Sequence, residues 1–67
     1  MKIQVNGKLV NIDDQIQTIA DLLKHYQLEN RIVVVELNRE IINKEGYGSQ
    51  SLHEGDQIEI VHFVGGG

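Results

Sequence analysis

The dipeptide Asn6-Gly7 constrains the fold of this chain more than any other feature, because alternating apolar and polar residues lie on both sides of it. Both residue types tolerate a positive φ, which the tightest two-residue β-hairpin loops require. A two-residue loop here pairs Ile3 with Val10 and brings the apolar residues of both runs to one face. The sequence therefore predicts an antiparallel hairpin over residues 1–5 and 8–12.

A short amphipathic helix is expected after the hairpin. Thr18 and Asp21 have the spacing of a capping box, in which each side chain bonds the backbone N–H of the other residue. Apolar residues then recur with the helical period, at Ile19, Leu22, Leu23 and Tyr26. We expect the helix to end near Gln27, with Asn30 suited to the stop, and to cover one face of a sheet.

Two β-branched segments supply the rest of that sheet. Residues 31–37 are expected to turn Val33, Val35 and Leu37 toward the core, and Ile32 and Val34 outward. A turn over residues 38–40 precedes a short edge strand that starts at residues 41–42. Leu52 is expected to anchor the end of the loop over residues 43–51.

The last strand follows a turn at residues 53–56. Its apolar residues Ile58 and Ile60 are expected to face the core, and we expect the strand to lie parallel to the first one. The element order is then ββαββ. One helix that crosses one face of a mixed sheet defines an α+β roll.

Composition excludes several classes of function. A chain of 67 residues forms a single domain, and ten acidic against six basic residues leave a net charge of −4, without the basic patch that nucleic acids require. The chain has no cysteine and no apolar run of about 18 residues, the length that spans a bilayer. We expect a cytoplasmic protein that is monomeric when free and binds neither nucleic acid nor membrane.

The residue types that often carry chemistry form no catalytic or metal-binding pattern here. His25, His53 and His62 have no metal-site spacing, and we expect them to be solvated. Asp13 and Asp14 are interpreted as a polar loop, and Asp56 as the residue that fixes its turn. The glycines and serines of one loop form no phosphate-binding motif and have no evident general base: Gly46, Gly48, Ser49 and Ser51. We expect no catalytic residue, no metal and no bound cofactor.

The chain ends in three glycines after an alternating strand. We expect a domain over residues 1–64 and a flexible tail over residues 65–67, which extends about 10 Å. The tail is thin enough to enter the active site of another protein, where the carboxylate of Gly67 would be activated. The competing interpretation is a disordered end without a role. An apolar patch on the open sheet face is expected to bind the partners, and it comprises Val34, Val61, Phe63 and Val64, with Leu9 beside it.

These features resemble a known family. The Asn6-Gly7 hairpin, the Asp-Leu-Leu of residues 21–23, the Gly-Asp-Gln-Ile-Glu-Ile of residues 55–60 and the terminal Gly66-Gly67 are similar to the ubiquitin-like sulfur carriers, the ThiS/MoaD-like family. Within that family the chain looks most like the thiamine-biosynthesis branch. The resemblance covers the whole chain and implies a β-grasp fold.

The resemblance also implies a mechanism. An adenylyltransferase (ThiF) would use ATP and magnesium to adenylate Gly67, and sulfur supplied through a cysteine desulfurase would convert it into a thiocarboxylate. A thiazole synthase (ThiG) would take that sulfur. Gly66 and Gly67 match the family pattern directly, and Gly65 is assigned flexibility. The alternatives are a molybdopterin-synthase-type carrier subunit, a protein-conjugating modifier, and a ubiquitin-like binding module that carries no sulfur.

Overall fold

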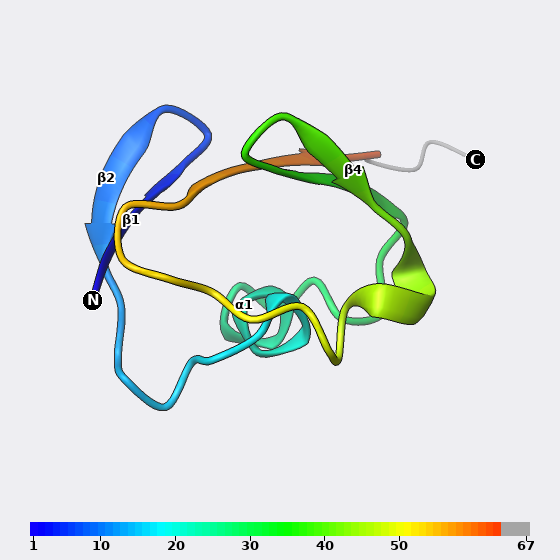
Figure 1. The fold of residues 1–67 in the computed structure, drawn as a ribbon. Coiled ribbons are helices and arrows are strands. Elements are labelled where there is room, and N and C mark those ends of the chain that lie inside the picture. The colour runs from blue at the N-terminus through cyan, green and yellow to red at the C-terminus, as the bar shows by residue number, and fades with distance from the viewer. Residues whose placement is uncertain (64–67) are drawn as a thin grey trace.

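A five-stranded mixed sheet arches over a single helix in the computed structural model, which describes residues 1–63 (Figure 1). The elements in chain order are β1 (Lys2–Val5), β2 (Lys8–Asn11), α1 (Ile19–His25), β3 (Val33–Leu37), β4 (Glu40–Ile42), a short 3-10 helix (Lys44–Gly46) and β5 (Gln57–His62). The spatial order of the strands is β2-β1-β5-β3-β4. The predicted ββαββ order and the parallel pairing of the first and last strands are confirmed. The predicted domain boundary at residue 64 and the glycine tail lie outside the described residues.

The first hairpin has the predicted register. Ile3 lies opposite Val10 and Val5 lies opposite Lys8. Asn6 and Gly7 both have positive φ, 50° and 83°, which is the requirement of a tight two-residue loop. Turn chemistry and apolar alternation therefore select the same pairing.

The second hairpin joins β3 to β4 through Asn38 and Arg39, which also have positive φ, 50° and 72°. Leu37 lies opposite Glu40, so β4 begins one residue earlier than the predicted turn allows. Asparagine tolerates this backbone region because its short side chain bonds locally, whereas arginine has no such advantage. Arg39 is therefore held in a strained conformation by the pairing on both sides of it.

Helix α1 begins with the predicted capping box. The Thr18 hydroxyl accepts from the N–H of Asp21 at 3.1 Å, and the Asp21 carboxylate accepts from the N–H of Thr18 at 3.2 Å. The helix ends at His25, close to the predicted end. The stop lies at Gln27 and not at Asn30, because Gln27 adopts a φ of 61°.

The C-terminal end of α1 is a Schellman motif. The N–H of Leu28 donates to the carbonyl of Leu23 at 2.8 Å, and the N–H of Gln27 donates to the carbonyl of Lys24 at 3.0 Å. Tyr26 follows the last helical residue and is 38% exposed, so its predicted place in the buried stripe is wrong. The apolar side of α1 is consequently shorter than its periodicity indicates.

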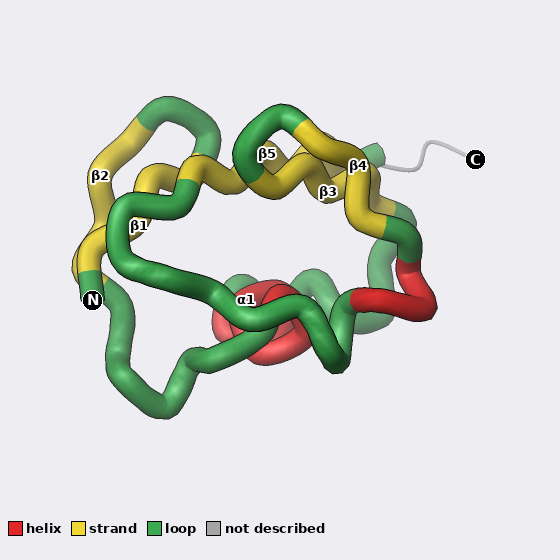
Figure 2. Tube along the Cα trace, in the orientation of Figure 1, coloured by secondary structure: helices red, strands yellow, loops and turns green. Residues whose placement is uncertain are grey.

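Helix α1 lies beneath one face of the sheet (Figure 2), and one cluster of buried side chains from both layers and their connections forms the core. Its buried side chains are Ile3, Val5, Ile12, Ile16, Ile19, Leu22, Leu23, Val35, Leu37, Leu52, Ile58 and Ile60. The predicted inward residues of β5 and the anchoring role of Leu52 are confirmed. Ile16 was not predicted, since it lies in a polar connection where no periodicity marks it. No helix within residues 1–63 is long and apolar enough to cross a membrane.

Candidate functional site

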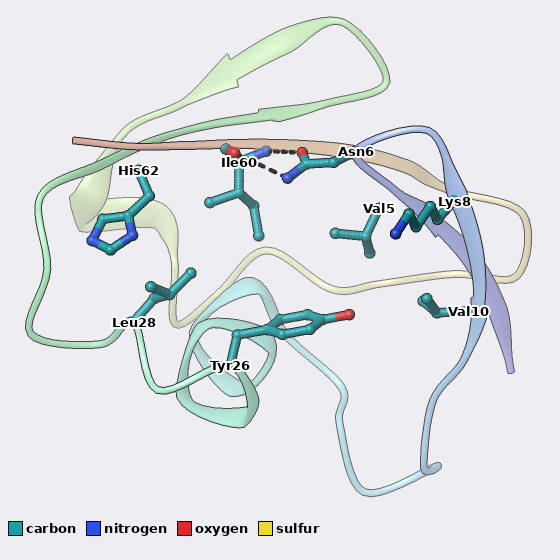
Figure 3. A pocket seen from close by; sticks show the side chains of 8 residues that line it. All are labelled: Val5, Asn6, Lys8, Val10, Tyr26, Leu28, Ile60 and His62. Carbon is teal, nitrogen blue, oxygen red and sulfur yellow. Dashed lines mark hydrogen bonds between the residues drawn. The ribbon is translucent and has the colours of Figure 1, made fainter. Parts of the chain in front are cut away.

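Strand β5 leads directly into the glycine segment, and both hairpin turns hold it in place. The Asn6 side chain accepts from the N–H of Ile60 at 2.7 Å and donates to its carbonyl at 3.2 Å (Figure 3). The Asn38 side chain accepts from the N–H of Gln57 at 3.0 Å and donates to the Asp56 carboxylate at 3.1 Å. Each turn asparagine thus fulfils two requirements, the positive φ of its loop and the hydrogen bonds of a neighbouring strand.

The open face of the sheet carries exposed apolar side chains at the end of β5. Val61 lies directly opposite Val34, so the two side chains share a face. Two residues on, the N–H of Phe63 donates to the carbonyl of Ile32 at 3.2 Å and extends the pairing. Val61, Phe63 and Ile32 are 52%, 54% and 76% exposed, and Val34 is half-buried. The structure therefore brings together three of the four predicted patch residues, and the fourth, Val64, lies outside the described residues.

Ile32 belongs to this surface although the sequence prediction did not include it in the patch. The alternation of β3 places Ile32 on the same face as Val34, and this was the signal that could have found it. We call the exposed set Ile32, Val34, Val61 and Phe63 the β5-end patch. Because the glycines begin two positions after Phe63 in the sequence, a partner that covers the β5-end patch has the glycine segment within reach.

Leu9 is exposed on the same face but lies away from the β5-end patch. It is 77% exposed and lies opposite Gln4, whose parallel partner is Gln57, at the start of β5. Val61 lies four residues further along that strand. Leu9 is thus a second exposed apolar position on the open face of the sheet, separate from the β5-end patch.

Two carboxylates lie next to the β5-end patch. Glu36 and Glu59 are directly opposite each other in the register of β3 and β5, and their side chains therefore point to the same open face. Like charges in this arrangement are unfavourable in the isolated sheet. A cation placed over the pair would relieve that repulsion, so the open face combines an apolar surface with an acidic one.

One of the three histidines departs from the prediction. His25 and His53 are exposed as expected, but His62 is half-buried. It faces the same side as Ile58 and Ile60 because every second residue of β5 points inward. Its Nε2 atom is excluded from solvent and has no hydrogen-bond partner within residues 1–63.

The loop carboxylates have structural roles, as predicted. Asp13 accepts from the N–H of Gln15 at 2.9 Å, and Asp56 accepts from the N–H of His53 at 2.7 Å. Within the described residues, no group of three or more histidine, cysteine or acidic side chains is placed to hold a metal ion. Neither acid is therefore assigned to catalysis.

Among the carboxyl groups of residues 1–63, Asp21 is the one with a clearly altered pKa. The backbone N–H of Gln17 donates to it at 3.0 Å, and the N–H of Thr18 donates as well. These bonds hold the pKa of Asp21 below its ordinary value of 3.8, against an opposing effect of desolvation. The cause is helix capping, which is a structural role.

Comparisons with known proteins agree with this architecture. The model of the ThiS family matches residues 3–67. The chain is 58% identical to the sulfur carrier protein ThiS of Bacillus subtilis, over 97% of this chain and 98% of that protein. A crystal structure of the thiamine biosynthesis protein ThiS from Geobacter metallireducens superimposes with a TM-score of 0.82 at 32% identity, covering all of both chains. The chain is also 39% identical over its whole length to part of a thiazole synthase from Paramagnetospirillum magneticum, of which it spans only 20%.

The fold is a five-stranded mixed sheet over one helix. Its open face is apolar at the end of β5, and the glycine segment follows in the sequence. These features define a β-grasp protein of the ubiquitin-like carrier class. Within that class the chain belongs to the ThiS family, the sulfur carriers of thiamine biosynthesis. The resemblance inferred from the sequence is thereby confirmed.

Proposed function

We propose that the carboxylate of Gly67 is the group that carries sulfur. An adenylyltransferase of the ThiF type uses ATP and magnesium to form an acyl-adenylate at Gly67, with release of pyrophosphate. The outer sulfur of a persulfide formed by a cysteine desulfurase then attacks the acyl-adenylate and displaces AMP. A thiol cleaves the resulting acyl disulfide, which leaves a thiocarboxylate on Gly67 and a new disulfide. A thiazole synthase of the ThiG type accepts that sulfur. Because the adenylation uses ATP, we place the reaction in the cytoplasm.

The observation that carries this proposal is the position of β5. The strand is bonded on one side to β1 and on the other to β3, and it ends at the β5-end patch, immediately before residues 64–67. The match to the ThiS family extends through Gly67, which supports a function for the glycine segment. The segment of a thiazole synthase that resembles this chain supports such a synthase as the acceptor.

The β5-end patch is the docking surface in this proposal. Apolar side chains exposed side by side on one sheet face are typical of protein interaction sites. The Glu36–Glu59 pair beside them favours a partner surface that carries an arginine or lysine. Gly65 and Gly66 would lie in the partner's active-site channel, where the absence of a Cβ keeps the chain narrow.

The docking surface is tested by Val61→Asp, with Leu9→Asp as the matched control. Both changes place a carboxylate at an exposed apolar position of the same sheet face, but only Val61 lies in the β5-end patch. We expect Val61→Asp to weaken binding to a ThiF-type adenylyltransferase at least tenfold, which is about 1.4 kcal/mol, while Leu9→Asp leaves the affinity unchanged. Equal affinities for the two variants, measured by calorimetry, would remove the β5-end patch from the proposal.

A further inference from the structure

A cavity of about 520 Å³ opens at one end of the roll, on the helix side of the sheet (Figure 3). Its apolar walls include Val5, Val10, Leu28 and Ile60. The volume lies in the range of small-molecule sites, which are mostly apolar and contain a few convergent polar groups. Neither the sulfur chemistry nor the β5-end patch uses this cavity, since the patch lies on the opposite face of the sheet.

The cavity exists because three elements end at different places. Strand β1 stops at Val5, where the hairpin turns, and α1 stops at His25, but β5 continues to His62. Beyond the end of β1, the Asn6 side chain satisfies the backbone of Ile60 in place of a neighbouring strand. Beyond Ile60 the inner face of β5 is therefore only partly covered, and His62 is half-buried there.

The polar groups of the cavity lie at its two ends. Lys8 and the Tyr26 hydroxyl are at one end, and the imidazole of His62 is at the other (Figure 3). Among the lining residues that the structure describes, Lys8 is the one with a lysine, arginine or acidic side chain. The Asn6 amide also lines it but is already bonded to Ile60, so Lys8, Tyr26 and His62 are the groups that can receive a ligand.

His62 gives a second, independent indication of a ligand. Its Nε2 atom is buried and has no partner within residues 1–63. Buried polar atoms in folded proteins are nearly always hydrogen-bonded, and leaving one unpaired is costly. Since Nε2 is excluded from solvent, a molecule in the cavity with a polar group at this end would supply the missing hydrogen bond only after the imidazole turns toward it.

We propose that the cavity binds a small organic acid. The acid group pairs with the Lys8 ammonium and the Tyr26 hydroxyl, and the apolar body lies against Ile60 and the neighbouring aliphatic side chains. A hydroxyl, amide or ring nitrogen at the far end bonds Nε2 of His62 once the imidazole has turned toward the cavity. An acid is favoured over a base because Lys8, the charged side chain that lines the cavity among residues 1–63, is positive, although the chain as a whole has a net charge of −4.

The test is an amide NMR titration of the full chain with phenylacetate, and with phenylacetamide and phenylethylammonium as its neutral and cationic analogues. We expect saturable shifts at Val10, Leu28 and His62 with phenylacetate, at a Kd in the millimolar range for so small a probe. Phenylacetamide should bind about fivefold more weakly, and phenylethylammonium more weakly still. The same experiment contradicts the proposal if the shifts do not saturate, if they centre on the open face of the sheet, or if the cation binds as tightly as the acid.

Lys8→Gln provides the matching change in the protein, with Lys2→Gln as the control. Both lysines are exposed strand residues, but only Lys8 lines the cavity. We expect Lys8→Gln to weaken phenylacetate binding about threefold to fivefold and to leave phenylacetamide binding unchanged, whereas Lys2→Gln changes neither. An equal affinity of phenylacetate for Lys8→Gln and the unmodified chain would overturn the assignment of the acid end.

Discussion

Replacement of Asn6 by alanine should remove a large part of the stability of this domain. The change deletes two hydrogen bonds to the backbone of Ile60, each worth about 0.5–1.5 kcal/mol. It also forces an alanine into a φ of 50°, which costs about 1–2 kcal/mol. The expected loss is therefore about 3 kcal/mol, against a total of about 3–10 kcal/mol for a chain of this length.

Two further variants separate these contributions. Asn6→Gly removes the hydrogen bonds but accepts the positive φ, so we expect a loss of about 2 kcal/mol. Asn43→Ala is the control, because Asn43 has a φ of −73° and its side chain makes no capping bond. Its expected effect is within about 0.5 kcal/mol.

Urea unfolding followed by circular dichroism measures all three variants, and the slope with denaturant should stay constant. A loss below about 1 kcal/mol for Asn6→Ala would refute the reasoning, because the side-chain bonds to β5 could then contribute little. Equal losses for the alanine and glycine variants would show that the turn is not strained.

Three other outcomes are expected. Ile60→Ala should cost about 2–5 kcal/mol because the side chain is buried, whereas the exposed Ile41→Ala should stay within about 0.5 kcal/mol. Similar losses for both variants would contradict this assignment of the buried face, and a larger loss for Ile41→Ala would reverse it. Gln27→Gly should raise the free energy of unfolding by about 0.5 kcal/mol, because glycine accepts the φ of 61° without strain, and a destabilised variant would contradict the Schellman end. The lowered pKa of Asp21 means that its capping contributes fully above the ordinary value of 3.8 and is lost as pH falls through the folded pKa. An NMR titration of the Asp21 carboxyl should show that lower midpoint, and a midpoint at or above 3.8 would refute it.

The fold was largely predictable because local chemistry and periodicity agree. Asn6-Gly7 accepts a two-residue loop, which keeps the apolar residues of both strands on one face, and the alternation of β5 identifies Ile58 and Ile60 as core residues. The Thr18 capping box likewise marks the helix start from side chains that are neighbours in the sequence. These features require no knowledge of distant contacts.

The features that were missed depend on contacts between distant segments. Asn6 and Ile60 are separated by 54 positions, so the turn asparagine gives no local sign that it bonds β5. Gln27 occupies a position where glycine is the usual signal, and only the Leu28 backbone bond to Leu23 reveals the helix end. The half-buried place of His62 follows from alternation, but the absence of a hydrogen-bond partner for its Nε2 within residues 1–63 is visible only in the folded structure.

The candidate site was predictable where strand register and alternation determine it. The pairing of Val34 with Val61 follows from the strand register, and the place of Ile32 beside Phe63 follows from alternation. The distance of Leu9 from this surface requires the strand order β2-β1-β5-β3, which periodicity does not contain.

The most direct test of the central claim is the intact mass of the protein after incubation with ATP, magnesium, sulfide and a ThiF-type adenylyltransferase. The account predicts the exchange of one oxygen for one sulfur, and no change in a chain that lacks Gly67. An unchanged mass in the presence of a demonstrably active adenylyltransferase, or the same sulfur incorporation without Gly67, would contradict it.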